Sequence, residues 1–247
     1  MRLTSNAQSP LRYPSLVAHA VRVLTHKGVM DMNGHVSARD AAAPTTMWIN
    51  SRRASRSTLT DHDVVPVDLI DGQRIGHGDE PPSEFHIHRA VMRRRPDVGA
   101  VIHSHPEFVV TLSIAGRPLQ PVCGIGSFLP EDVPVFDAAN LINTVDRGEA
   151  IAGAIGDAPI LVLRGHGTVV VGATIEEAVA RFVCAEENAR MQFNASLLGK
   201  VQVLRGSELA AVRRETWTPT IVEKHWHYHV ESARRDGALD GLDPLEA

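Results

Sequence analysis

The chain has 247 residues, 43% hydrophobic and 22% charged, a balance typical of a folded globular protein that excludes an intrinsically disordered one. Its 25 Lys and Arg against 29 Asp and Glu leave a net charge of −4, so no basic excess indicates nucleic-acid binding. The absence of an apolar run of roughly 18 residues, of a signal-peptide core and of CxxC spacing predicts a cytoplasmic protein without a membrane partner.

One domain accounts for the chain, because no repeat, low-complexity tract or linker interrupts it. We expect a flexible N-terminal arm at 1–13, a catalytic domain at 14–230 and a C-terminal tail at 231–247. In the first half, apolar periodicity and turn residues predict these elements: a helix from Pro14 to about Gly28, a turn at 31–37 leading into a strand, a strand at 47–50 and a hairpin from 64–69.

The second half alternates helices and short apolar strands. Its predicted elements are a helix at 84–95 capped by Ser83, a strand at 99–105, helices at 108–115 and 137–145, strands at 160–163 and 168–171, and a helix from Thr174 to about 198. Residues 116–136 are expected to be irregular. Residues 223–230 are rich in His and aromatic side chains, and they would alternate between two faces if they formed a strand.

Three histidines in two motifs point to a metal site. His103 and His105 are two apart at the end of a predicted strand, so their imidazoles should share one face. His166 lies in a Gly-His-Gly turn, where the glycines leave space around the ring. Either motif alone also occurs in purely structural positions. Together they offer three neutral imidazoles and an open position, which is typical of a catalytic zinc site.

Three segments resemble the class II aldolase/adducin family: GVMDMNGHVSAR at 28–39, PPSEFHIHRAVMRRRPDVGAVIHSHP at 81–106 and LRGHG at 163–167. They occur in the family's order and spacing, and the resemblance spans residues 14–200. It implies a three-layer α/β/α single domain with a central, largely antiparallel sheet. It also implies a homotetramer with active sites between subunits.

The resemblance further implies the site residues. His103, His105 and His166 match the family's ligands for a divalent metal, most often Zn²⁺, with Mn²⁺ or Co²⁺ as alternatives. Glu84 matches the acid–base carboxylate. Adducin-like members lack these ligands, so a chain that keeps all of them is expected to be a metal-dependent lyase and not an interaction module.

The substrate segments depart from the sugar-phosphate aldolases. His35 replaces the Asn of a Gly-Asn-x-Ser turn, Arg follows Ser51 where glycine would let the backbone approach phosphate, and Pro82 replaces a serine before Ser83. We predict substrate binding by His35, Ser51, Arg52, Arg53, Ser83 and His88. The imidazole of His35 and the two guanidinium groups would suit a carboxylate, although a solvated surface run of arginines remains the alternative.

These departures favour decarboxylation of a hydroxylated carboxylic acid through a metal-stabilised enolate. A small-molecule substrate of the aromatic diol acid type, such as a dihydroxyphthalate or dihydroxybenzoate, would chelate the metal through vicinal oxygens. An aldolase or epimerase acting on a sugar or sugar phosphate is the alternative function.

Further residues outside the metal motifs are candidates for supporting roles. His88 follows Glu84 by four residues and could orient it, since both would share one helix face, with a solvated or capping role as the alternative. Tyr228 is a candidate acid, because family aldolases use a C-terminal tyrosine from a neighbouring subunit. The roles of His225, His227 and His229 stay open.

Overall fold

In the computed structural model, which describes residues 12–245, seven strands form one sheet in the order β3-β2-β1-β4-β7-β6-β5. Neighbouring strands are antiparallel, except that β5 and β6 are parallel. The strands are β1 (His35–Arg39), β2 (Thr46–Asn50), β3 (Val64–Asp68), β4 (Ala100–Ser104), β5 (Val135–Phe136), β6 (Ile160–Leu163) and β7 (Gly167–Gly172).

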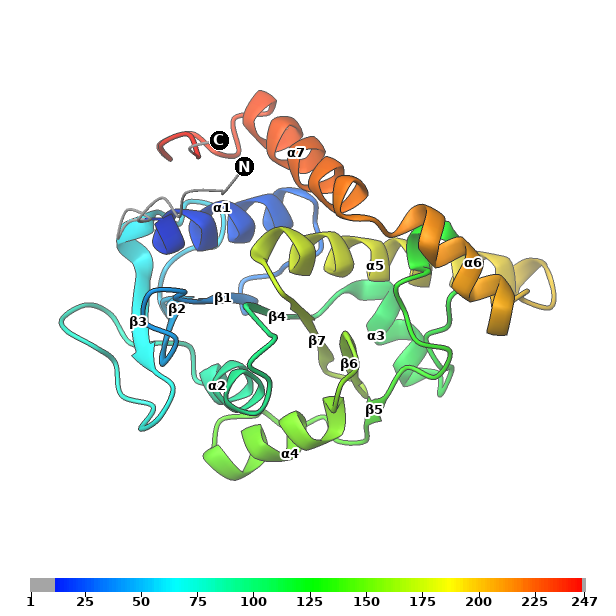
Figure 1. Ribbon diagram of the computed structural model, residues 1–247, viewed down its shortest axis with the longest axis horizontal. Helices are drawn as coiled ribbons and strands as arrows, with labels where there is room; N and C mark the ends of the chain where they lie inside the picture. Colours follow the sequence, from blue (N-terminus) through cyan, green and yellow to red (C-terminus); the bar gives the residue numbers. More distant parts are fainter. Residues whose placement is uncertain (1–11, 246–247) are drawn as a thin grey trace, which may run out of the picture.

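Helices cover both faces of the sheet (Figure 1), and the predicted three-layer α/β/α fold is confirmed. α1 and α5 lie on one face with α7 packed on top of them, and α2 and α4 cover the other. The helices are α1 (Arg12–His26), α2 (Phe85–Arg94), α3 (Glu107–Ile114), α4 (Val145–Ile155), α5 (Ile175–Leu198), α6 (Gly206–Thr216) and α7 (Pro219–Arg235). No helix within residues 12–245 combines the length and apolar character needed to cross a membrane.

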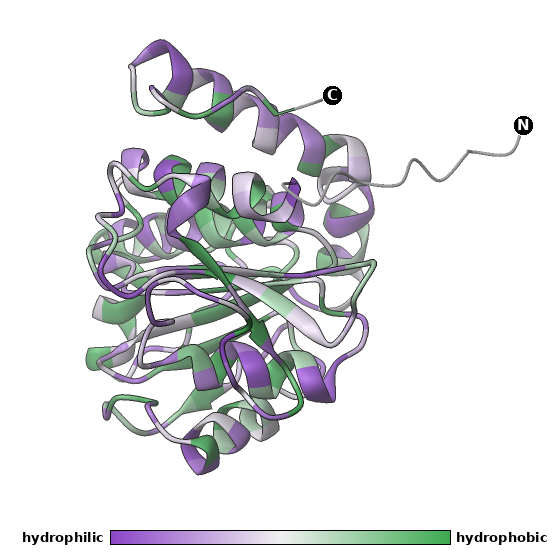
Figure 2. Cartoon of the chain, turned by 90° about the vertical axis from the view of Figure 1, so that its left-hand side faces the viewer, coloured by the Kyte–Doolittle hydropathy of each residue, from purple (hydrophilic) through white to green (hydrophobic). Residues whose placement is uncertain are grey.

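Strand alternation divides the core between the two faces. In β4, Ala100 and Ile102 belong to the cluster beneath α1 and α5, whereas Val101 belongs to the cluster beneath α2 and α4. Figure 2 shows the hydrophobic colour running through the sheet between the more hydrophilic outer helices. Because side chains alternate along a strand, His103 projects to the same face as Val101, toward α2.

The helix predicted at 137–145 is wrong. Residues 137–144 form a loop, and α4 begins at Val145 after Thr144, whose hydroxyl caps the helix by accepting from the Arg147 amide. Asn and Thr favour caps and turns over helix interiors. In addition, the backbone N–H of Ile142 donates a hydrogen bond to the Glu84 side chain and not to a helical carbonyl.

The C-terminal expectations also need correction. Residues 223–230 belong to helix α7, not to a strand, and α7 continues to Arg235, beyond the domain end placed at 230. The expected tail is packed: the Arg22 guanidinium donates to the carbonyls of Ala238 and Asp240, and Leu239 is buried. At the other end α1 already begins at Arg12, and the rest of the expected arm, residues 1–11, lies outside the described residues.

Candidate metal centre

Four side chains from three separate segments converge on one point. Glu84, His103, His105 and His166 each offer one ligand atom, and these atoms all lie within 4.8 Å of one another. Glu84 immediately precedes α2, so the predicted Ser83 cap is replaced by Glu84 at that position. The three imidazoles that the sequence grouped are therefore close enough to share a metal ion.

The sheet and one glycine create this arrangement. His103 lies on β4 opposite Val169 of β7, while His105 lies just beyond the end of β4. Their ring centroids are 5.2 Å apart. A Cβ atom at Gly167 would lie 2.5 Å from the Ser104 carbonyl oxygen and 2.8 Å from Cδ2 of His105. Only glycine at position 167 lets the β6–β7 turn approach the His105 ring this closely.

Outer contacts orient two of the imidazoles. Nδ1 of His103 donates to the Thr168 carbonyl at 3.0 Å, and Nδ1 of His105 donates to the Asp31 carboxylate at 2.9 Å. With the proton held on Nδ1, each ring keeps the lone pair on Nε2 for a metal. Such second contacts are typical of histidines that ligate metals.

The charge states of the cluster also suit a metal. Burial alone would raise the pKa of Glu84, but His103, the Ile142 amide and His166 outweigh it and lower this pKa to about 2. Burial, reinforced by His103, lowers the pKa of His166 to about 4. At neutral pH the site therefore offers an ionised carboxylate and a neutral His166 imidazole, the forms that bind divalent cations.

The atoms of the cluster fit a divalent ion. Nε2 of His103 is buried without a hydrogen-bond partner among the described residues and lies 3.6 Å from Oε2 of Glu84. Nε2 of His166 lies 3.7 Å from Oε1 of the same carboxylate. Ligands at about 2.1 Å from a tetrahedral ion would be about 3.4 Å apart. Small adjustments would thus bring the donors onto one metal.

A pocket of about 410 Å³ opens beside the cluster, a size suited to a small molecule. Among the predicted substrate-binding residues, His35, Arg52 and Ser83 line it. Its lining is Met32, Asn33, His35, Arg52, Arg56, Pro82, Ser83, Glu84, His105 and Leu141.

Three predicted substrate residues, Arg53, Ser51 and His88, are not part of this lining. Arg53 is exposed, and its amide donates to Asp79. Ser51 is buried, and its carbonyl accepts from Arg56. Sequence reasoning missed Arg56, which is buried at the pocket wall. Arg56 belongs to the same polar run as Arg52 and Arg53, and no sequence signal marks it as the arginine that turns inward.

His88 supports His35 instead of Glu84. Its Nε2 lies 3.0 Å from Nδ1 of His35, and its Nδ1 lies 2.7 Å from the Ser37 hydroxyl. Both imidazoles are buried, and burial, with His103 nearby, lowers the pKa of His88 to about 3. The chain of hydrogen bonds therefore fixes the ring of His35 at the pocket wall.

Tyr228 lies elsewhere on the subunit. It is 67% exposed on α7, which packs against α1 and α5 on the sheet face away from α2. Its ring contacts His229. A role for Tyr228 in the site of a neighbouring subunit stays a prediction.

The largely antiparallel α/β/α fold, the cluster that could hold a metal and the comparisons with known proteins together support a metal-dependent lyase. The chain belongs to the class II aldolase/adducin family, because residues 15–193 match the model of the class II aldolase and adducin N-terminal domain. It is an enzyme of this family that acts on small-molecule substrates.

The similar proteins include both decarboxylases and an aldolase. The chain is 33% identical over 189 residues to 3,4-dihydroxyphthalate decarboxylase of Rhodococcus jostii, covering 71% of this chain and 77% of that protein. It is 31% identical to the decarboxylase NovR of Streptomyces niveus, covering 85% and 79%. In fold it is similar to L-fuculose 1-phosphate aldolase of Glaciozyma antarctica, with a TM-score of 0.84, 22% identity, and 98% and 97% coverage.

Proposed function

We propose that the protein is a decarboxylase of an aromatic acid that carries vicinal hydroxyl groups. One observation carries this proposal: the pocket beside the metal cluster presents two guanidinium groups, those of Arg52 and Arg56, and the imidazole of His35. These groups suit carboxylates. The relatives named as decarboxylases of a dihydroxyphthalate support the same substrate class.

A divalent metal held by His103, His105 and His166 would supply Lewis-acid chemistry toward the hydroxyl and carboxylate oxygens of the substrate. Glu84 is the group that moves a proton. With its low pKa it enters the reaction ionised, so it can accept a hydroxyl proton and return it to the ring carbon that loses carbon dioxide. The Ile142 amide, 2.7 Å from Oε1, holds the carboxylate in place during this transfer.

The finer assignments are part of the same proposal. We assign zinc as the resident metal, because three imidazoles are the typical ligands of catalytic zinc. We also assign a cytoplasmic homotetramer with the pocket near a subunit boundary. Met32 and Leu141, both on the pocket wall, are 81% and 55% exposed, and a neighbouring subunit would bury them.

An aldolase or epimerase acting on a sugar or sugar phosphate is the second candidate, favoured by the similarity in fold to L-fuculose 1-phosphate aldolases. A phosphate group is usually held by several backbone amides near glycine. Here Arg52 and Pro82 occupy pocket positions where such a turn would need small residues.

The test is a parallel screen of the zinc-loaded protein against dihydroxyphthalates, dihydroxybenzoates and sugar phosphates. We expect carbon dioxide to be released in a one-to-one ratio with loss of an aromatic acid. Cleavage of a sugar phosphate to an aldehyde, without carbon dioxide from any acid, would establish the second candidate instead.

A further inference from the structure

Arg56 is a buried cation held in place by backbone carbonyls. Its side chain is 5% exposed, Nε donates to the Gly34 carbonyl at 2.7 Å, and Nη1 donates to the carbonyls of Ser51 and Ala54. Nη2 has no hydrogen bond to any of residues 12–245. The guanidinium is therefore rigidly positioned and still has donor capacity.

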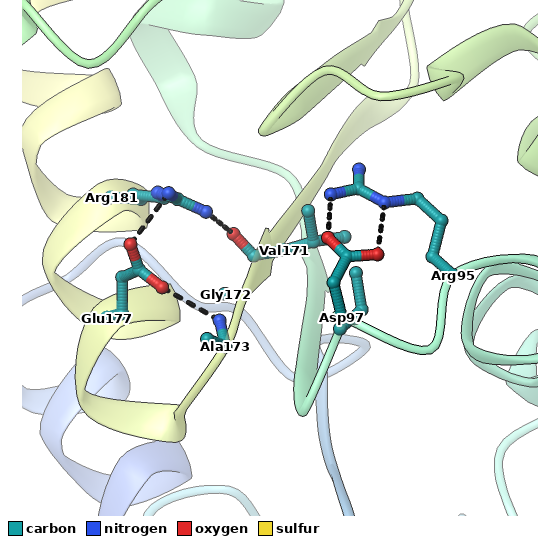
Figure 3. A pocket seen from close by; sticks show the side chains of 8 residues that line it. Arg95, Asp97, Val171, Gly172, Ala173, Glu177 and Arg181 are labelled. Carbon is teal, nitrogen blue, oxygen red and sulfur yellow. Dashed lines mark hydrogen bonds and ion pairs between the residues drawn. The ribbon is translucent and has the colours of Figure 1, made fainter.

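No carboxylate among the described residues forms an ion pair with Arg56, which sets it apart from the arginines of a second cavity (Figure 3). There Arg95 lies 2.6 Å from Asp97, and Arg181 lies 2.7 Å from Glu177. Each arginine of that cavity is therefore paired with a carboxylate, which leaves no unpaired guanidinium there for a bound anion. Asp31 attracts the Arg56 cation from beyond ion-pair distance, but its carboxylate pairs directly with His105. A buried cation without an adjacent anion is costly, and a bound anion offsets this cost.

Location separates Arg56 from other buried arginines. Arg89 is also buried and also donates to backbone carbonyls, those of Leu69 and Ile70, but it does not line the pocket beside the cluster. Arg56 does, together with Arg52 and Glu84. Glu84 faces the histidine cluster and Asp31 pairs with His105, so the guanidinium groups of Arg52 and Arg56 are left for a bound anion.

We propose that Arg56 binds a carboxylate that the substrate keeps, so that the substrate is a dicarboxylic acid and the product a monocarboxylic acid. This inference rests on the proposed decarboxylase function. A carboxylate that leaves as carbon dioxide loses its charge on the way to the transition state. A guanidinium paired with it would stabilise the ground state more than the transition state and slow the reaction.

The reaction balances with the second carboxylate unchanged. Glu84 takes a proton from a ring hydroxyl and delivers it to the ring carbon that bears the departing group. The bond from that carbon to the carboxylate then breaks, its electron pair stays on the ring and restores aromaticity, and carbon dioxide leaves. The product is the phenolate of a monoacid, and Arg56 keeps its ion pair throughout.

The test compares two probes that differ in one carboxylate, 3,4-dihydroxybenzoate and catechol, in calorimetric titrations of the zinc-loaded full chain. We expect the wild-type protein to bind the acid about 10- to 100-fold more tightly, as hydrogen bonds to a charged group allow. Arg56→Met should bring the two affinities within about threefold of each other, and Arg56→Lys should give an intermediate ratio. Both variants should bind catechol as the wild type does.

Arg89→Met is the matched control, because it also removes a buried guanidinium from backbone carbonyls but should keep the wild-type ratio. An unchanged ratio in Arg56→Met, or an equal loss of catechol and acid binding, would overturn the proposal. Tighter binding of glycerol 1-phosphate than of the acid would do so too. We also expect no carbon dioxide from 3,4-dihydroxybenzoate, because its one carboxylate corresponds to the retained group, and its decarboxylation would overturn the proposal. Failure of the decarboxylase function itself would appear separately, as absence of carbon dioxide from every acid in the screen.

Discussion

The Nδ1 atom of His105 lies 2.9 Å from Oδ2 of Asp31, in the loop that precedes β1. Asp31 also accepts from the Asn33 amide, and Asn33 lines the pocket. One carboxylate therefore fixes both a candidate metal ligand and part of the pocket wall. A carboxylate on the far nitrogen of a ligating histidine makes the ring a stronger ligand.

We expect Asp31→Ala to weaken zinc binding by about 10- to 100-fold, the usual effect of removing such an outer contact. Competition with a chromophoric chelator measures this affinity. Asp236→Ala is the control, because Asp236 also contacts a histidine, His26, but on the exposed surface. Equal zinc affinity in the Asp31 variant and the wild type would remove Asp31 from the site.

Glu84→Gln should keep zinc and lose turnover by a factor of about 100 or more. Glutamine retains an oxygen that can accept from the Ile142 amide but cannot carry the proton. The measurement pairs metal content with the rate of carbon dioxide release. Wild-type turnover in this variant would show that another group moves the proton.

Gly167→Ala should disrupt the cluster, because the added Cβ would lie 2.5 Å from the Ser104 carbonyl oxygen and 3.3 Å from Cε1 of His103. We expect a loss of zinc affinity that exceeds any loss of folding stability. Gly153→Ala is the control: its Cβ would meet only the Arg94 guanidinium at 3.4 Å, and alanine favours the interior of α4. Retained zinc affinity in Gly167→Ala would contradict the close packing of this turn.

Acid should destabilise the protein partly through His229 on α7. Burial, with Lys27 and His225 nearby, lowers its folded-state pKa from 6.5 to about 4. The unfolded chain therefore binds this proton more readily. The stability that His229 contributes is complete above pH 6.5 and is lost as the pH falls toward 4.

The loss should amount to at most about 3 kcal/mol of unfolding free energy between pH 7 and pH 4, and solvent screening around the ring reduces it. Urea unfolding across this range should show a smaller pH dependence for His229→Phe than for the wild type. His227→Phe, on an exposed position of the same helix, should leave the dependence unchanged. Identical slopes for all three proteins would contradict the assignment to His229.

Local sequence predicted the elements that carry the candidate metal ligands. Alternation along 99–105 and the glycines around His166 are local signals, and the strands β4, β6 and β7 formed where they indicated. Glu84 is different: nothing local joins it to the histidines, and only the resemblance to a family connected them. Its contact with Ile142 depends on a loop remote in the sequence, within the range 137–145 where local pattern predicts a helix and the structure has a helix only from Val145.

The substrate-binding residues were harder to predict from sequence, because they depend on which arginine of the polar loop at 52–56 turns toward the pocket. Arg52, Arg53 and Arg56 are equivalent in sequence, yet Arg53 is exposed and Arg56 is buried. The difference arises from the carbonyls of Gly34, Ser51 and Ala54, which meet only in the folded chain. Likewise, His88 bonds to His35 and Ser37 of β1, so its four-residue spacing from Glu84 did not identify its partners.

The metal content of the purified protein, measured by plasma mass spectrometry, tests the central claim most directly. The wild-type chain should carry about one divalent ion per subunit after loading and dialysis. His103→Ala and His166→Ala, each missing one of three imidazoles, should carry almost none and should show no activity. Stoichiometric metal in both variants, or none in the loaded wild type, would contradict the account.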